Sequence, residues 1–312
     1  VCVKYVPDAQ AERTFNASDS TTDRVNVDGL LSELDEYAVE EALKFVEAGE
    51  GEVTVLTIGP DEASDAIKKA LQMGADKGVH VIDDAIHGSD ALATSLLLAK
   101  AIEKIGVPDL IVTGMSSTDG IMGVVPTMLA ERLGLPAVTF ASELTVGSGT
   151  VSARRDGDVA SQTIEAALPA LVSVTDQINE PRYPSFKGIM AAKKKAVETW
   201  TLADLGVSAD EVGLDAAWTK VTSFEARPPR AKGTIVKDEG DGGAKLAGSL
   251  AVDDGALPAR RPCVAGGPPG PGGVDADLVG VHAEGRHRPP LGGRLPRRQL
   301  PPAGGAARRV HP

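Results

Sequence analysis

The sequence predicts an α/β fold, in which a mainly parallel sheet carries helices on both faces. Short apolar runs alternate with longer amphipathic stretches over residues 1–136, and Gly or Pro closes most of the runs. This alternation is typical of parallel sheets, whose strands are connected by helices. Shorter runs then follow without helices between 138 and 175, so a small antiparallel extension is expected beside the main sheet.

The chain begins with an apolar run at 1–5, which is predicted to be a strand. The run starts without Met, so a few preceding residues are expected to be missing. Ser32 with Asp35 three positions later resembles a capping box, and the apolar stripe that follows predicts a helix up to Val46. Residues 52–58 are predicted to form the next strand, which stops at a Gly-Pro pair.

The alternation continues through the middle of the chain. A helix over 61–73 ends at a glycine, and a short strand is expected at 79–82. The next helix, over 90–105, begins at a Ser-Asp pair, and the apolar run 109–113 predicts another strand. After a loop, a helix over 125–133 closes with Gly-Leu-Pro.

The last part of the body changes character. The runs 138–142, 150–154, 162–166 and 171–175 are joined by Gly or Pro, and they are predicted to be antiparallel or edge strands. They complete one α/β domain with a β extension. A short closing helix is expected at 243–248.

The composition changes abruptly at residue 253. Residues 253–312 contain 11 Pro, 12 Gly and 9 Arg, but no Lys, Ile, Phe, Tyr, Trp or Met. Such a segment cannot bury enough apolar surface to offset its ordering entropy, so it is predicted to be disordered. Losing so many residue types at once is typical of a GC-rich gene read out of frame. We therefore interpret the tail as a frameshift product, with a basic interaction arm as the alternative.

Composition also excludes several classes of function. The net charge of −12 argues against nucleic acid, and no apolar stretch approaches the ~20 residues that a bilayer span needs. Cys2 and Cys263 have neither a disulfide framework nor a metal-type spacing. His80 and His87, the histidines outside the tail, have no nucleophile or metal-like arrangement around them. An enzyme with its own acid–base or nucleophilic chemistry is therefore disfavoured.

A loop rich in Gly and hydroxyl side chains follows the strand at 109–113. Its glycines allow a ligand to approach the backbone, and Pro126 lies early in the next helix. Because free N–H groups at a helix start favour phosphate, nucleotide binding is one interpretation, with Asp119 accepting from a ribose hydroxyl. A flexible surface loop is the other.

The stretch 179–195 is a polar loop, broken by Pro, that leads into a basic helix. Phe186 lies between Ser185 and Lys187, and an exposed aromatic there is a plausible interface anchor. The alternative is that Phe186 is tucked back into the core. The Lys triplet 193–195 is expected to be a solvated face.

Several ordered stretches together resemble the beta subunit of the electron transfer flavoproteins. They are Val3-Lys4, the helix sequence 35–43, the segment 70–76, and Asn-Glu-Pro-Arg-Tyr at 179–183 with the Ile-Met and Lys run that follows it. The resemblance covers about residues 1–248 and stops at the tail. It implies a Rossmann-like nucleotide-binding domain over 1–200 and a C-terminal arm over 201–252 that wraps an alpha subunit.

The resemblance also implies the ligands: an FAD held mostly by the alpha subunit, and one structural AMP in the beta subunit. Asp119 is kept from the family pattern, but Gly120 and Gly123 stand where bulkier polar residues often occur. Leu34 is a candidate for packing against the edge of the flavin ring. Carried over by position, the AMP-binding residues are Cys2, Ser32, Glu33, Leu34, Asp35, Ile58, Gly114, Met115, Ser116, Ser117, Thr118, Asp119, Gly120, Ile121, Met122, Gly123, Val124 and Val125.

The implied docking residues for dehydrogenases match the stretch after Arg182, with Phe186 where family members commonly have Leu. They are Tyr183, Pro184, Ser185, Phe186, Lys187, Gly188, Ile189 and Met190. Phe186 is expected to insert into a pocket of the dehydrogenase, after which the flavin domain of the alpha subunit swings close for one-electron transfer.

The resemblance thus implies an electron carrier, located in the bacterial cytoplasm, that serves acyl-CoA and other flavin dehydrogenases and the respiratory chain. A bifurcating or nitrogen-fixation type, with a second FAD in place of AMP, is an alternative. A stand-alone adenine-nucleotide-binding protein of the stress-protein type is another, although such a protein has no use for the stretch 179–195.

Overall fold

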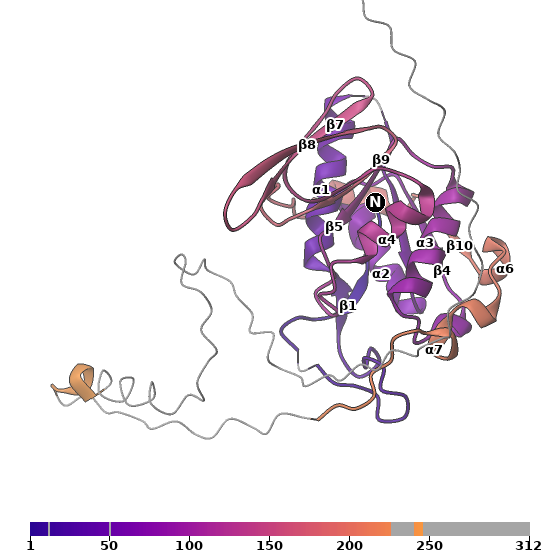
Figure 1. Ribbon diagram of the computed structural model, residues 1–312, viewed down its shortest axis with the longest axis vertical. Helices are drawn as coiled ribbons and strands as arrows, with labels where there is room; N and C mark the ends of the chain where they lie inside the picture. The colour runs from indigo at the N-terminus through magenta and orange to yellow at the C-terminus, as the bar shows by residue number, and fades with distance from the viewer. Residues whose placement is uncertain (12, 50, 226–239, 246–312) are drawn as a thin grey trace, which may run out of the picture.

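The computed structural model describes residues 1–11, 13–49, 51–225 and 240–245, and it confirms the predicted α/β fold. A mainly parallel sheet runs through the domain with helices on both of its faces (Figure 1). The hairpin of β7 (Thr150–Asp156) and β8 (Ser161–Ala167) extends the sheet at one end, as the antiparallel extension predicted from the sequence.

The strands of the main sheet follow the order β10-β4-β3 in one half and β5-β9-β6-β7-β8 in the other. Pairing is parallel in the first half and between β5, β9 and β6, and it is antiparallel from β6 to β8. The bounds are β3 Thr54–Ile58, β4 Lys77–Val81, β5 Leu110–Gly114, β6 Ala137–Val146, β7 Thr150–Asp156, β8 Ser161–Ala167, β9 Ala170–Val174 and β10 Val197–Trp200.

The N-terminal residues join the two halves of the sheet. Cys2 forms parallel bridges to Leu56 of β3 and to Thr113 of β5. The strand predicted at 1–5 is therefore present, but as two parts. Its first part, around Cys2, is parallel to β3 and β5. Its end belongs to β1, Tyr5–Pro7, which pairs antiparallel with β2, Gly29–Leu31, because the chain leaves the parallel sheet after Val3.

The helices follow the predicted alternation and cover both faces. Leu56 and Ile111 pack in one buried cluster with α3 and α4, whereas Val55, one position before Leu56, packs with α1 and α2 on the other face. The carboxylate of Asp90 accepts from the N–H groups of Leu92 and Ala93 at the start of α3, as its position predicted. The bounds are α1 Glu33–Ala48, α2 Ser64–Met73 after the 3₁₀ turn Asp61–Ala63, α3 Ala91–Ile105, α4 Val125–Leu133, α5 Phe186–Ala192, α6 Leu202–Leu205 and α7 Gly213–Ala216, with further 3₁₀ turns at Asp84–Ile86 and Ala209–Glu211.

Two strands differ from the sequence-based expectation. The run expected to be an antiparallel or edge strand at 171–175 is β9, which is fully buried and pairs in parallel on both sides. A strand buried on both faces is a short continuous apolar run, and periodicity alone does not place it in a sheet. β10 was not predicted, because its Val-Glu-Thr-Trp sequence is short and mostly exposed at the edge beside β4.

Part of the predicted arm, 201–252, lies within the described residues. Its apolar side chains Leu202, Leu205 and Val212 are buried in the same cluster as α3 and α4. The final described residues include a helical turn at 242–245, whereas the remainder of the expected closing helix and the tail 253–312 lie outside the described residues. Within the described part, no helix combines the length and apolar character needed to cross a membrane.

Candidate functional site

Asp35 ties three chain segments together at the carboxyl ends of the parallel strands. Its Oδ2 accepts from the backbone N–H of Lys4 at 2.8 Å, and its Oδ1 accepts from that of Gly114 at 3.3 Å. Ser32 is the N-cap residue of α1, but the predicted capping box does not form, because the Ser32 side chain makes no cap hydrogen bond. The Asp35 carboxylate bonds to Lys4 and Gly114 instead. Burial raises the pKa of Asp35 to about 7.

Gly114 allows this close approach. A Cβ at this position would lie 2.5 Å from Asp35 Oδ1 and 2.8 Å from the carbonyl oxygen of Leu34. Real Cβ atoms do not come so close to backbone oxygens, so the start of α1 can lie against the end of β5 only with glycine here.

Two hydroxyl groups beside this junction have no hydrogen-bond partner among the described residues. They are Ser32 Oγ, in a side chain that is fully buried, and Thr118 Oγ1 in the loop after β5. Buried hydroxyls are nearly always paired in folded proteins. Ribose and phosphate oxygens are suitable hydrogen-bond partners for hydroxyl groups, so these two atoms fit a nucleotide as the ligand.

Asp119 is the centre of a second polar group. Its side chain is 4% exposed, and it pairs with Lys4 Nζ at 2.9 Å and with Arg24 Nη2 at 2.5 Å. Although burial opposes ionisation, the two cations hold the pKa of Asp119 below its usual value. Arg13 also donates to the carbonyl of Thr118, so both Arg13 and Arg24 contact the loop after β5. The sequence does not predict these ion pairs, because Lys4 and Arg24 are distant from Asp119 along the chain.

The other predicted AMP-binding residues differ in burial: some pack against the core and others are exposed. Cys2, Ile58 and Val125 pack against one buried cluster, and burial raises the pKa of the Cys2 thiol to about 11, so it stays neutral. Ile121 and Met122 instead point toward solvent, with exposures of 58% and 57%. The backbone of Ile121 is left-handed, at a φ of 51°, which turns the loop before α4.

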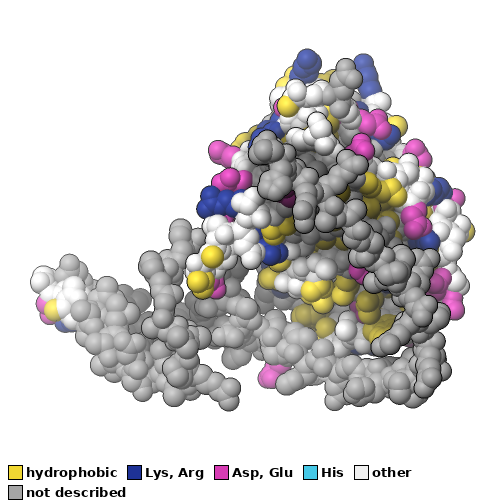
Figure 2. Space-filling model, turned by 45° about the horizontal axis from the view of Figure 1, so that its top comes forward, with side chains coloured by type: hydrophobic (Ala, Val, Ile, Leu, Met, Phe, Trp, Pro, Cys, Tyr) yellow, Lys and Arg dark blue, Asp and Glu magenta, His cyan; other side chains and the backbone are white. Residues whose placement is uncertain are grey.

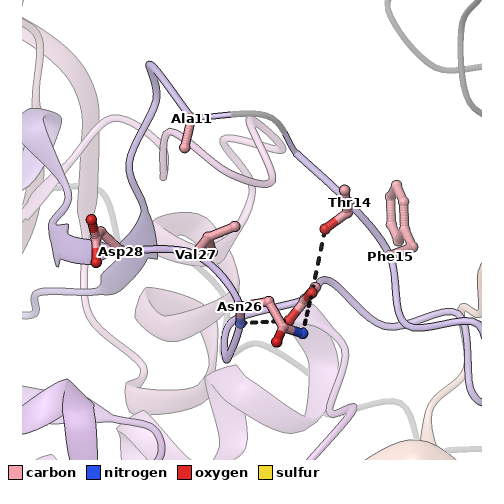
Figure 3. A pocket seen from close by; sticks show the side chains of 7 residues that line it. Ala11, Thr14, Phe15, Asn26, Val27 and Asp28 are labelled. Carbon is pink, nitrogen blue, oxygen red and sulfur yellow. Dashed lines mark hydrogen bonds between the residues drawn. The ribbon is translucent and has the colours of Figure 1, made fainter.

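A pocket of about 640 Å³ lies apart from the predicted set, between two arms of the segment 8–28 (Figure 3). Asp23 holds the arms together by accepting from Thr14 and Asn26. The pocket is lined by Ala11, Thr14, Phe15, Asp23, Asn26, Val27 and Asp28.

The predicted docking residues 183–190, here called the docking segment, lie on the surface. Tyr183 is 92% exposed and Phe186 is 80% exposed at the first position of α5, so the alternative in which Phe186 is tucked into the core is wrong. Ile189 and Met190 are partly exposed on the same helix. On the face drawn in Figure 2, apolar side chains gather in the middle, with charges of both signs toward the edges.

The residues on either side of the docking segment make ion pairs and helix caps that the sequence does not predict. Arg182 pairs with Glu40 and Glu47 of α1, and Lys195 donates to the last carbonyls of α2. The expectation of a solvated Lys triplet is therefore wrong for Lys195. The motif at 179–183 is evident in the sequence, but nothing local in it indicates its partners on α1.

No group of three His, Cys, Asp or Glu side chains within the described ranges is placed to hold a metal ion. His80 is buried, and its Nε2 lies 3.0 Å from the carbonyl oxygen of Gly59. His87 lies on the surface, with its Nε2 2.8 Å from Asp19.

Comparison with known proteins gives one consistent result. The family model described as "Electron transfer flavoprotein domain" matches residues 20–205. The chain is 49% identical to the electron transfer flavoprotein subunit beta of Mycobacterium leprae over 251 residues, which cover 79% of this chain and 94% of that protein. The Mycobacterium tuberculosis protein of the same name is 48% identical with the same coverage. The caffeyl-CoA reductase-Etf complex subunit CarD of Acetobacterium woodii is 35% identical over 80% of this chain and 95% of that protein.

Proposed function

The chain belongs to the electron transfer flavoprotein family, among its beta subunits, and we propose that it pairs with an alpha subunit to carry electrons from flavin dehydrogenases. Acyl-CoA dehydrogenases are the expected donors, and the respiratory chain is the expected acceptor. The observation that carries this proposal is the 49% identity over 94% of a protein named as a beta subunit. The exposed aromatic side chains of the docking segment support it, since a stand-alone nucleotide-binding protein has no use for them.

We propose that the carboxyl edge of the sheet holds AMP. Two groups around it fit a nucleotide: Ser32 and Thr118 carry buried hydroxyls that have no partner among the described residues. Gly114 lets the start of α1, with Ser32, lie directly against the end of β5. Asp119 is already bound to Lys4 and Arg24 in this structure, so its proposed bond to a ribose hydroxyl would have to be shared with these cations.

In the proposed mechanism, this chain orients the partners and does no acid–base chemistry of its own. The FAD, held mostly by the alpha subunit, supplies the electron-accepting chemistry when bound. Phe186 and Tyr183 would engage the dehydrogenase, and Leu34, half-buried beside Asp35, is the residue proposed to face the flavin ring. The cytoplasm of a bacterium is the proposed location.

A second candidate function places another FAD in the beta pocket instead of AMP, as in bifurcating types. The relative named as a subunit of a caffeyl-CoA reductase-Etf complex keeps this alternative open, because it matches 80% of this chain at 35% identity.

The nucleotide content of the heterodimer tests both candidates. The chain is co-expressed with its alpha-type partner, the complex is denatured, and the released nucleotides are separated and quantified. One FAD and one AMP per heterodimer are expected. Two FAD would move the assignment to the second candidate, and no complex or no flavin would contradict electron carriage by this chain.

A further inference from the structure

The docking segment holds its large apolar side chains out in solvent. Its helix α5 contains no buried residue, and Tyr183 and Phe186 are almost fully exposed. An exposed aromatic on an unsupported loop samples many orientations, and a partner that binds it has to overcome that lost freedom. The residues immediately before and after these apolar side chains are nevertheless held by ion pairs and hydrogen bonds to α1 and α2.

Arg182 ties the docking segment down on the N-terminal side. Its guanidinium is paired at two points with Glu40, through Nε at 2.7 Å and Nη2 at 2.9 Å, and at two points with Glu47, at 2.5 and 3.0 Å. The backbone N–H of Arg182 also donates to Glu40. Two-point pairing on both sides fixes the plane of the guanidinium, so the chain leaves α1 in one direction.

The same strip of α1 holds the residues that precede Arg182. Asn179 Nδ2 donates to the carbonyl of Tyr37 and to the carboxylate of Glu41, both at 3.0 Å. Side chains three, four and seven positions apart share one face of a helix. Thus Tyr37, Glu41, Glu40 and Glu47 form a continuous surface along which the stretch 179–182 lies.

Lys195 ties the segment down on the C-terminal side. Its ammonium donates to the carbonyls of Leu71 at 3.1 Å and Gly74 at 2.9 Å, and also to that of Ala75, where α2 ends. A cation at this position satisfies carbonyls that no helical N–H reaches, and it interacts favourably with the helix dipole. Between the two ties, α5 lies directly on α2, since a Cβ at Gly188 would be 2.4 Å from the carbonyl oxygen of Gln72.

We infer that Arg182 and Lys195 are positioning residues for docking, which hold the segment 183–190 between α1 and α2 so that Phe186 meets the dehydrogenase in one orientation. The inference rests on the proposed function of the docking segment. Glu40 and Glu47 are the partners through which Arg182 acts. None of these four residues has to touch the dehydrogenase.

The experiment uses the heterodimer as the substrate of a purified acyl-CoA dehydrogenase. The variants are Phe186→Ala, Arg182→Gln, Lys195→Met and Glu47→Gln. Arg154→Gln is the matched control, because Arg154 also pairs with two carboxylates, Glu143 and Asp156, but on the β extension. The KM for the heterodimer, the kcat, and hydrogen exchange of residues 183–192 are measured for each variant.

We expect Arg182→Gln to raise the KM at least about fivefold, because several side chains have to be ordered again on binding. The kcat should be unchanged, and faster hydrogen exchange should be confined to the docking segment and its flanks. Lys195→Met should have the same pattern, Glu47→Gln a weaker one, and Arg154→Gln none. Phe186→Ala should raise the KM without faster exchange.

The outcomes separate the inference from the proposed function. If Phe186→Ala leaves the KM unchanged, docking through this segment is wrong. If Phe186→Ala raises the KM while Arg182→Gln and Lys195→Met behave like Arg154→Gln, the positioning role is overturned and docking stands. Exchange that spreads through α1 and the sheet would also overturn it. Should Arg182→Gln fail to fold, Glu47→Gln and Lys195→Met decide by the same criteria.

Discussion

The loop after β5 and the docking segment differ in which side chains they bury and which they expose. Around the loop after β5, the carboxylates Asp35 and Asp119 are buried, and each accepts from two or more donors. In the docking segment, the aromatic side chains of Tyr183 and Phe186 are exposed to solvent, whereas the ion pairs of Arg182 lie in the N-terminal flank.

Because of this difference, mutations in the two regions should affect different properties, namely stability in the first and binding in the second. A buried carboxylate is tolerated only while its partners remain, so changes in the first region should alter the free energy of unfolding. An exposed aromatic side chain contributes little to folding, so changes in the second should alter binding alone. Three substitutions and one pH dependence test this difference, and the substitutions are given in order of decreasing expected loss of unfolding free energy.

Gly114→Ala should cost the most, about 2–3 kcal/mol of unfolding free energy, because the added Cβ meets Asp35 and backbone atoms of Leu34 that cannot move aside. Denaturant unfolding of the heterodimer measures the loss. Gly120→Ala is the matched control in the same loop, since the nearest atom to its Cβ would be Ser117 Oγ at 3.4 Å. Equal losses in the two variants would contradict the close approach at Gly114.

Asp119→Asn should cost about 2 kcal/mol, since it leaves Lys4 and Arg24 without their shared carboxylate; the partial exposure of both cations keeps the loss below that of a fully buried pair. Asp65→Asn, which breaks the exposed pair with Lys68, is the control and should change little. The thermal midpoint and the nucleotide content are measured together. A variant with wild-type stability would show that Asp119 does not organise this region.

The pH dependence of stability should carry a signature of Asp35. Its pKa is about 7 in the folded state and about 4 when unfolded, so the folded state binds more protons between these values. This carboxyl therefore makes stability fall as pH rises from 4 to 7, by at most about 1.4 kcal/mol per pH unit. The unfolding free energies of the wild type and Asp35→Asn are compared across this range. The wild type should lose unfolding free energy relative to Asp35→Asn as the pH rises. If the wild type instead gains unfolding free energy relative to Asp35→Asn, the raised pKa of Asp35 is refuted.

Phe186→Ala should change the unfolding free energy by less than about 0.5 kcal/mol, because its side chain is 80% exposed. It should nevertheless slow electron uptake from the dehydrogenase about tenfold, as expected for an interface anchor. Stopped-flow reduction of the heterodimer measures the rate, and the flavin content is measured in parallel. Loss of flavin in this variant would point to a role for Phe186 in the core.

The sequence determined the order of the elements and the type of most of them. Helix boundaries at Asp90 and Gly134 follow from local chemistry, a carboxylate that caps N–H groups and a glycine that takes a left-handed backbone. The family was recognisable because its motifs are continuous in the chain, and the exposure of Phe186 was one of two predicted alternatives. Its role in docking and the membership of the AMP pocket stay predictions.

The tertiary structure decided which residues meet across long stretches of sequence. No local pattern pairs Arg182 with Glu40, Asp119 with Lys4, or Asp35 with the N–H of Gly114, because their separations are set by how the strands and helices pack. The same holds for β9: local sequence specifies an apolar strand, but only its neighbours decide that it is central and parallel. The backbone conformation of a cap or turn depends on adjacent residues, so the sequence predicts it. Ion pairs and strand order depend on contacts that exist only after the chain has folded.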